Sequence, residues 1–516
     1  MRAPLRAPLR APLRVALGAL GALLCVPLGA SALRALTAES LQRPEEPLSA
    51  AAAARAGEAA ARLRADPEPA LARLSRALTI EVTSRDAPPP PAQTEELWRW
   101  VEEAYPAARA ALSWRYVGQS LLLTWESPAP VAPPALLLAH IDTVPAEGAW
   151  THPPHSGARA EGFIWGRGAL DDRSSALAIL EALELLLARG YAPTRTLYFA
   201  FGHDEEVGGA GARAVSEVLA RELAGAAPGR GRLAWVLDEG GAVTEGLVPG
   251  LAAPVALVGV AEKGYLTLEL RARGEGGHSS MPPPRTAAGA LSAAIARLEE
   301  RPAPVDLDAA VALTARWLAP ELPPLQRWAL SNLWLTAPLV RRIYEARPSS
   351  AALLRTTAAA TQLSASPKEN VLPLEAVGVV NLRLLPGDSA AAAQERVRAL
   401  VADLGVEVTA RAGASEASPR AAAAGPLAEG WRRLHAALAH SSPEVLIAPY
   451  LTLGATDSRH YAHLADGVYR LSALRLGPAD LARIHGVDER VGEGDYLKLI
   501  ELYLALLAPD LSTSRR

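Results

Sequence analysis

Short apolar runs alternate with longer segments of helical periodicity along the first half of the chain. Four runs without a charged residue lie at 120–125, 135–139, 196–201 and 233–237. Uninterrupted apolar runs of this length are typical of parallel strands that are buried on both faces. The segment 174–189 begins on serines and ends before Gly190, so it is predicted as a helix, as is 94–111. This alternation predicts an α/β fold with a mostly parallel central sheet flanked by helices.

The pattern changes near residue 264. The segment 265–271 alternates apolar and polar positions with a period of two, and 377–384 reads similarly. This period is typical of antiparallel strands with one exposed face. We therefore predict a catalytic domain in two parts with an α+β lid domain inserted between them, at 33–263, 264–400 and 401–516.

The N-terminus has the pattern of a targeting segment. Ala-Pro-Leu-Arg occurs three times before an uncharged run over 15–33, which contains Ala30-Ser31-Ala32 near its end. A basic start, an apolar run and an Ala-x-Ala exit predict a signal peptide over 1–32 and a secreted, extracellular protein. The alternative is a signal-anchor helix, since the run is just long enough to span a bilayer. Glycine and proline residues in the run favour the cleaved peptide.

Composition narrows the classes of function. The 516 residues are 50% hydrophobic and carry a net charge of -3, which gives a large core and nothing that suggests a nucleic-acid partner. The only cysteine, Cys25, lies in the predicted signal peptide. The mature chain is therefore predicted to contain no disulfide.

Acidic residues and histidines follow the apolar runs and recur near the C-terminus. The clusters are His140-Ile141-Asp142, Asp171-Asp172, Glu205-Glu206, Asp238-Glu239 and His485. Residues at the carboxyl ends of parallel strands converge in one crevice. Carboxylate and imidazole groups are the ligands that zinc takes together. The series predicts a two-metal hydrolase site, although any single acidic pair is more often a solvated loop charge or a helix cap.

With these clusters in this order, residues 65–510 resemble the di-zinc aminoacylase and glutamate-carboxypeptidase family. The segment 166–171 matches its Gly-Arg-Gly-x-x-Asp pattern. The segments 202–207, 456–460 and 483–490 are most similar to members that form and cleave the amide between a fatty acid and an amino acid. The resemblance implies two Zn²⁺ per subunit and a zinc-peptidase-like catalytic domain with a lid.

The resemblance also implies a role for each cluster. Its zinc ligands are His140, Asp171, Glu206 and His485. Asp171 bridges the two ions and is followed by a cis peptide bond, while Asp142 orients the imidazole of His140. Glu205 is the general base. The remaining ligand is Asp238 or Glu239; the register favours Glu239 by one residue, and both stay candidates.

Four further residues are implied to contact the substrate. His278 in the lid donates to the carbonyl oxygen of the scissile amide, often across a dimer interface. Asn370 and Arg383 match lid positions that hold the substrate carboxylate, for which the planar guanidinium of arginine is suited. Arg459 is another candidate near the site.

The predicted function is a secreted di-zinc amidohydrolase that hydrolyses and condenses N-fatty-acyl amino acids. The alternatives are a dipeptidase or carboxypeptidase of the same family and a non-catalytic carrier, although no ligand or general base is missing. The expected partners are fatty acids, amino acids and their conjugates, a lipoprotein or membrane surface, and a second copy bound through the lid. The Trp-rich stretch 305–354 either lines a slot for an acyl chain or is ordinary core.

Overall fold

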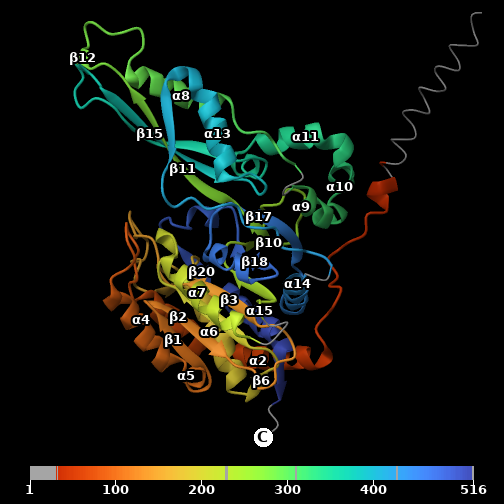
Figure 1. Cartoon of the computed structure of the whole chain (residues 1–516). Helices are drawn as coiled ribbons and strands as arrows, with labels where there is room; N and C mark the ends of the chain where they lie inside the picture. Colours follow the sequence, from red (N-terminus) through yellow and green to blue (C-terminus); the bar gives the residue numbers. More distant parts are fainter. Residues whose placement is uncertain (1–30, 32, 227–230, 308–310, 426–427, 514–516) are drawn as a thin grey trace, which may run out of the picture.

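Two β-sheets divide the chain into a larger and a smaller body (Figure 1). The computed structural model describes residues 31, 33–226, 231–307, 311–425 and 428–513. The predicted signal peptide, 1–32, lies outside the described residues apart from Ser31. Across the described ranges, no helix combines the length with the apolar character that a membrane crossing requires.

The larger sheet has ten strands, and its centre is parallel, as the sequence predicts. The strand order is β1-β2-β7-β3-β8-β18-β10-β9-β19, with β17 paired to β10. Strand β3 runs parallel to both β7 and β8, and β8 runs parallel to β18. The predicted apolar runs become β2, β3, β7 and β8. The ten strands are β1 (Ser113–Val117), β2 (Ser120–Trp125), β3 (Ala135–His140), β7 (Leu197–Gly202), β8 (Trp235–Asp238), β9 (Ala242–Thr244), β10 (Val255–Glu262), β17 (Leu446–Thr452), β18 (Val468–Arg470) and β19 (Arg475–Leu476).

Alternate residues of the central strands face different helix layers. On β3, Leu137 packs into the cluster formed with α6 and α15, whereas Leu136 and Leu138 pack into the cluster formed with α7. Both faces of the sheet are therefore covered, which is why these strands are apolar throughout. The helices of this body are α2 (Ala50–Ala65), α3 (Glu68–Leu78), α4 (Pro91–Ala104), α5 (Pro106–Ala111), α6 (Arg173–Leu187), α7 (Ala210–Ala224), α14 (Glu429–Ser441) and α15 (Glu493–Leu507).

The predicted helix over 94–111 is two helices, α4 and α5, which meet at Tyr105. Pro106 begins α5, and a proline disfavours helical geometry in the residue before it. Tyr105 accordingly has φ -124° and ψ 65°. The sequence prediction of one helix was wrong because it gave this proline too little weight.

The smaller sheet forms the lid and is antiparallel, in the order β13-β15-β11-β16. Its strands are β11 (Gly264–Arg273), β13 (Thr357–Ser364), β15 (Glu375–Leu384) and β16 (Val406–Ala410). Buried positions alternate along β11, as its period of two predicts, and they pack against α8 (Ala287–Glu300) and α13 (Ala390–Val401). Because β16 pairs with β11, the lid sheet extends past residue 400, the predicted end of the insertion.

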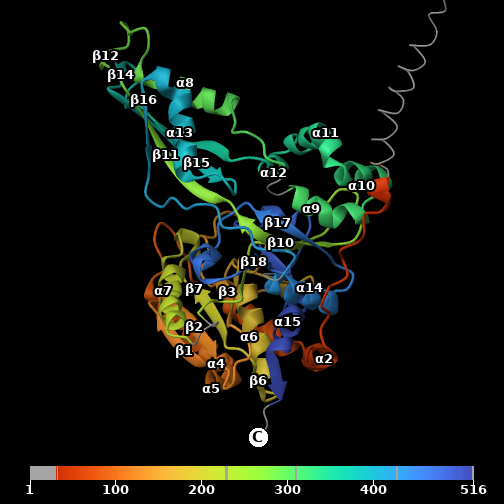
Figure 2. The same cartoon turned by 45° about the vertical axis from the view of Figure 1, so that its right-hand side comes forward.

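A short two-stranded ribbon lies at the end of the lid farthest from the larger sheet (Figures 1 and 2). It pairs β12 (Gly277–His278) with β14 (Val371–Leu372). Ten residues of β11 separate the root of the lid from this end, which at about 3.3 Å per residue is roughly 30 Å. The ribbon is therefore remote from the strand ends of its own catalytic domain.

Four helices interrupt the lid sequence and return to the larger body. They are α9 (Val311–Leu318), α10 (Pro324–Ser331), α11 (Leu333–Glu345) and α12 (Pro348–Ala351). Trp317 of α9 packs edge-on against Trp431 of α14, with ring centroids 4.8 Å apart. The Thr314 hydroxyl donates to the Pro449 carbonyl at 2.6 Å. At least α9 thus packs as core against the catalytic domain.

Small pairings bring the C-terminal segment back to the first half of the chain. Strand β20 (Arg490–Gly492) pairs with β5 (Phe163–Trp165), which also pairs with β4 (Arg159–Ala160). Strand β21 (Leu511–Thr513) pairs with β6 (Tyr191–Pro193). The β5–β20 pairing places the loop that carries His485 beside the loop that carries Asp171.

Candidate metal centre and active site

The predicted ligands lie at one edge of the larger sheet. His140 is the last residue of β3 and Asp238 is the last residue of β8. Glu205 and Glu206 begin the short helix η1 (Glu205–Val207), which starts three residues after the end of β7. Because β3, β7 and β8 are parallel neighbours, their carboxyl ends open into the same crevice.

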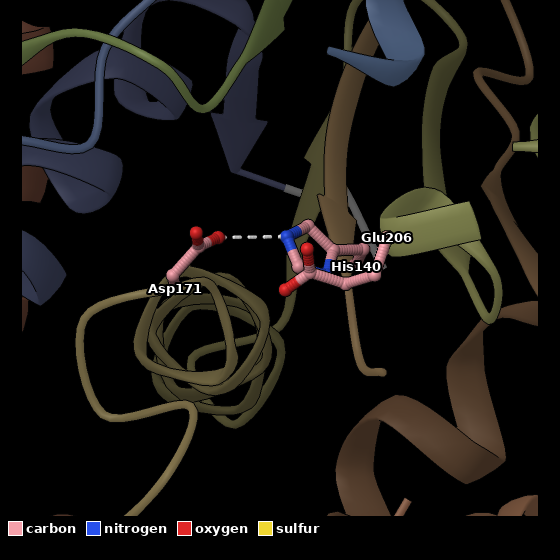
Figure 3. A group of neighbouring side chains, drawn as sticks. All are labelled: His140, Asp171 and Glu206. Carbon is pink, nitrogen blue, oxygen red and sulfur yellow. Dashed lines mark hydrogen bonds and ion pairs between the residues drawn. The ribbon is translucent and has the colours of Figure 1, made fainter. Parts of the chain in front are cut away.

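Asp171 occupies the centre of the cluster, between two imidazoles. Its Oδ1 is 2.9 Å from His140 Nε2, and its Oδ2 is 3.1 Å from His485 Nε2. Glu206 Oε2 is 3.2 Å from the same nitrogen of His485. Figure 3 shows His140, Asp171 and Glu206 pointing toward one another from β3, the loop before α6 and η1. One carboxylate thus presents each of its oxygens to a different histidine, which is the arrangement that a bridging ligand needs.

Charge and burial in this cluster fit divalent cations. Burial opposes the ionisation of Asp171, but hydrogen bonds with His140 and His485 outweigh it and lower its pKa. Hydrogen bonds with Asp171 and Glu206 raise the pKa of His485 to about 10. Among the described residues, nothing bonds to the buried Oε1 of Glu206. A buried carboxylate oxygen without a donor is costly, and a metal ion is a suitable partner for it. His140, Asp171 and Glu206 each offer one ligand atom within 4.8 Å of the others.

Glu489 holds the Asp171 loop in place, and the sequence reasoning gave this residue no role. Its buried carboxylate pairs with Arg167 at 2.6 Å and accepts hydrogen bonds from the backbone N–H groups of Gly168, Leu170 and Asp171. The peptide bond between Asp171 and Asp172 is cis, as the resemblance implies. Glu489 lies only four residues after His485, the last predicted ligand. An acidic residue so close to a ligand was the feature of the sequence that could have identified this supporting role.

Asp142 connects the histidine to the two glutamates. The Nδ1 atom of His140 lies 3.0 Å from the Asp142 carbonyl oxygen and 3.4 Å from its carboxylate. The same buried carboxylate accepts hydrogen bonds from the backbone N–H groups of Glu205 and Glu206, at 3.1 and 3.2 Å. Ser84 Oγ donates to it at 2.6 Å. Asp142 therefore fixes both the imidazole and the backbone of η1.

Glu205 lies beside Arg459, with 3.9 Å between Oε1 and Nη1. Burial raises the pKa of Glu205 well above its ordinary value, and the carboxylates of Asp457 and Glu206 add to the effect. A carboxyl group with a raised pKa, next to candidate metal ligands, is suited to carry a proton. Arg459, predicted only as a substrate contact, thus lies directly beside the predicted general base.

The two candidates for the remaining ligand have different surroundings. Asp238 is buried, and its Oδ2 accepts a hydrogen bond from the Ser458 N–H at 2.7 Å. Burial raises the pKa of Glu239 well above its ordinary value, and the charge of Asp171 adds to the effect. Asp238, by contrast, already has a backbone donor. Both remain candidates.

Asp457 is a second buried acid that the sequence reasoning passed over. Within the described part of the chain, neither of its carboxylate oxygens has a hydrogen-bond partner. A Cβ atom at Gly209 would lie 2.1 Å from Oδ1, so only glycine fits there. Burial raises the pKa of Asp457 well above its ordinary value, and the charge of Asp238 adds to the effect. In the neighbouring sequence, the one feature that could have drawn attention to Asp457 was its position two residues before Arg459.

The lid residues are not brought to this cluster within one chain. His278 is exposed on the remote ribbon, and the Ser279 N–H donates to the Asn370 carbonyl at 3.1 Å. These two predicted residues therefore lie together at the far end of the lid. Arg383 lies at the other end of β15, near the root of the lid, with its guanidinium 4.8 Å from the ring centroid of Tyr265.

Comparisons with known proteins give one family. A family model described as Peptidase family M20/M25/M40 matches residues 136–508. The protein named N-fatty-acyl-amino acid synthase/hydrolase PM20D1 from Mus musculus is 41% identical over 382 residues, which cover 73% of this chain and 74% of the mouse protein. Its human namesake is 39% identical over 394 residues, covering 75% and 76%. Probable carboxypeptidase S-like 2 of Dictyostelium discoideum is 36% identical over 393 residues, covering 75% and 74%.

Solved structures share the fold at low sequence identity. An M20 family metallo-carboxypeptidase, Sso-CP2 from Sulfolobus solfataricus, matches with a TM-score of 0.60 and 16% identity, covering 85% of this chain and 99% of its own. Human carnosine dipeptidase 1 matches with a TM-score of 0.56 and 15% identity, covering 88% and 99%. These likenesses support the two-body architecture and carry no argument about substrate.

Removal of metal is expected to lower the thermal stability of this chain. A ligand at a hundredfold excess over its Kd stabilises the folded state by about 2.7 kcal/mol. We expect Zn²⁺ to raise the unfolding midpoint in a calorimetric or fluorescence melt and a chelator to reverse the change. His140→Ala should abolish the response, while His463→Ala, at an exposed histidine, should keep it. An unchanged zinc response in His140→Ala would contradict the assignment.

Proposed function

The chain belongs to peptidase family M20/M25/M40, and on that premise we propose that it is a secreted di-zinc amidohydrolase acting reversibly on N-fatty-acyl amino acids. The observation that carries the hydrolase assignment is the position of Asp171 between His140 and His485, with Glu205 close by. The fatty-acyl amino acid class is supported by the mouse and human relatives that carry this name. Secretion is supported by the signal-peptide pattern over 1–32 and would be tested by N-terminal sequencing of protein from the culture medium.

The residues of the cluster divide the chemistry. His140, Asp171, Glu206 and His485, with Asp238 or Glu239, would hold the two zinc ions. When bound, the ions polarise the amide carbonyl and make a water molecule more acidic. Glu205 accepts the proton of the attacking water and delivers it to the amide nitrogen as the carbon–nitrogen bond breaks. The products are a fatty acid and an amino acid, and the same proton transfers in reverse join them.

A peptidase of the same family is the second candidate. It is favoured by the carboxypeptidase name of the Dictyostelium relative, whose identity and coverage are similar. The two candidates differ in what occupies the acyl side of the scissile bond. An N-fatty-acyl substrate presents an alkyl chain, whereas an unblocked dipeptide presents a charged amino group.

His278 is proposed to act in the site of a second copy of the chain. It lies roughly 30 Å along the lid from the root, which separates it from the metal cluster of its own chain. The outer strand of the lid sheet, β13, is exposed along almost its whole length and carries no charged residue. An unprotected edge of this kind can pair with the same edge of another copy. Such a pairing would create a two-fold dimer through the lid.

Association with a lipid surface is proposed through α11. Leu335, Leu339 and Ile343 are four residues apart on this helix and are 41%, 55% and 61% exposed. Arg341 and Arg342 are exposed beside this apolar stripe, in a chain whose net charge is -3. Helix α11 lies at one side of the molecule, beside the lid (Figure 2). An apolar stripe with basic neighbours suits an anionic lipid surface, from which acyl substrates would be drawn.

A panel of N-oleoyl-phenylalanine and unblocked dipeptides tests the substrate class. We expect metal-dependent release of phenylalanine from the acylated compound, with little cleavage of the dipeptides. Glu205→Gln should retain zinc and lower kcat by about 100-fold to 10,000-fold, because the proton acceptor is lost. Preference for the dipeptides would move the assignment to the peptidase. Full activity of Glu205→Gln would remove Glu205 as the base.

Mixed dimers test the role of His278. A chain with His278→Ala and a chain with Glu205→Gln should each be nearly inactive alone. When the two are co-expressed, about a quarter of the wild-type activity is expected, because half of the dimers have one complete site. No recovery would show that His278 does not act across the interface.

Vesicle sedimentation tests the lipid surface. The wild-type protein should sediment with anionic vesicles, and each nearby arginine should contribute about 1 kcal/mol. The variant Leu335→Ser/Leu339→Ser/Ile343→Ser should stay in solution. The control variant Leu363→Ser/Leu374→Ser removes two similarly exposed leucines from the lid. It should bind to the vesicles as the wild type does. Equal loss in both variants would rule out α11 as the docking face.

A further inference from the structure

The chain crosses between the catalytic domain and the lid at several places, and three described crossings meet around Glu262 and Lys263. Glu262 is the last residue of β10 and Gly264 is the first residue of β11. The return crossing lies alongside, since the Glu262 N–H donates to Ser418 Oγ at 2.8 Å. Tyr265 exchanges two backbone hydrogen bonds with Ser415, both 2.8 Å long. The third crossing, from α12 to β13, contacts Lys263.

Lys263 binds the α12–β13 crossing with its ammonium group. Its Nζ donates to the carbonyl oxygens of Ala352 and Arg355, at 3.0 and 2.8 Å, and lies 3.4 Å from Thr357 Oγ1. The side chain is almost fully buried. A buried ammonium needs such acceptors, so the start of β13 is tied to this one residue. Any displacement of the lid root therefore acts on Lys263.

Glu262 points the other way, into the catalytic domain. Its Oε2 accepts hydrogen bonds from Arg470 Nε at 3.0 Å, Thr456 Oγ1 at 2.9 Å and Thr456 N–H at 3.1 Å. Glu262, Arg470 and Thr456 are each no more than 2% exposed. Because one carboxylate oxygen receives all three donors, its position determines where Thr456 lies.

Arg470 depends on this carboxylate. Among the described residues, its two terminal nitrogens are buried without hydrogen-bond partners. Glu262 is its ion-pair partner, and the charge of nearby Asp238 also acts on the guanidinium. Breaking a buried ion pair by removing one partner leaves the other charge uncompensated. The pair is therefore a rigid reference point at the carboxyl end of β18, the neighbour of β8.

From Thr456 a short path leads to the general base. Thr456 begins the turn into η4 (Asp457–His460). The carbonyl oxygen of Thr456 accepts a hydrogen bond from Arg459 Nη1 at 3.1 Å, and the same nitrogen lies 3.9 Å from Glu205 Oε1. The Ser458 N–H on the same turn donates to Asp238. The turn thus places the Arg459 side chain beside Glu205 and directs the Ser458 N–H to Asp238, a candidate ligand.

We propose that Glu262 is a positioning residue which, with Lys263, couples the placement of the lid to the placement of Arg459 beside Glu205. The connection runs from the α12–β13 crossing through Lys263 and Glu262 to Thr456, and from there to Arg459. A shift of the lid at this crossing moves the η4 turn. Arg459 is therefore correctly placed beside Glu205 only when the lid itself is correctly placed. The inference rests on the proposed role of Glu205, but its structural part is independent of any substrate.

Backbone hydrogen exchange, read by mass spectrometry on the full-length zinc-loaded protein, tests the coupling directly. Glu262→Gln and Thr456→Val should each lower the protection of amides 456–459 by about tenfold, because the turn loses its anchor. Lys263→Met should lower the same protection although the Lys263 side chain bonds only to the α12–β13 crossing. Asp510→Asn is the matched control, since it disrupts a buried ion pair with Arg195 far from the site. Unchanged exchange at 456–459 in Lys263→Met would overturn the coupling.

Kinetics with Arg459→Met then separate positioning from general loss of stability. Glu262→Gln is expected to lower kcat by about 10-fold to 100-fold, the cost of a misplaced catalytic group. In the Arg459→Met background the same change should have little further effect, because its route to Glu205 is already absent. Additive losses, or an equal loss in Asp510→Asn, would overturn the proposal. If the wild type does not hydrolyse N-oleoyl-phenylalanine, the proposed function fails while the exchange comparison still decides the coupling.

Discussion

The crowding of carboxylates at one sheet edge is the constraint on which the rest of the structure depends. Asp171, Glu205, Glu206 and Glu239 lie close enough that burial and mutual repulsion raise the pKa of Glu205 and Glu239 well above ordinary values. Negative charges a few ångströms apart in a partly desolvated crevice repel one another strongly. The arrangement is stable only when cations neutralise it or some of the acids are protonated. Each buried arginine, histidine and backbone donor around the crevice can be understood as part of that compensation.

Supporting residues hold the ligands from behind. Arg173 is fully buried, and its guanidinium donates to the carbonyl oxygens of Ile141, Ala77 and Ile80 at 2.9, 3.0 and 2.6 Å. Ile141 lies between His140 and Asp142, so this arginine fixes the backbone of the first ligand segment. Arg173 therefore supports the ligand geometry without touching a ligand.

The sequence predicted the strands and the ligand clusters because their signals are local. An apolar run that ends in His140 specifies both a buried strand and the residue at its carboxyl end. The roles of Glu262 and Glu489 could not be predicted in this way, since their partners lie far along the chain. The motif at His278 identifies the residue and its place in the lid, while the length of β11 decides how far it lies from the cluster of its own chain. Pro106 shows the opposite case, in which a local signal was present and was given too little weight.

The division of the chain into a rigid sheet edge and a separate lid has a consequence for how the site works. The candidate metal ligands all come from the larger body, where both faces of the sheet are packed and little movement is expected. The candidate substrate contacts His278, Asn370 and Arg383 all come from the lid, whose sheet has its own core. A site divided in this way needs some connection between recognition and chemistry, because substrate held by the lid must meet a base held by the sheet. The crossings at Glu262 and Lys263 connect the two directly, and the buried pair with Arg470 anchors this connection in the larger body. A surface ion pair, screened by water and free to change rotamer, could not do this.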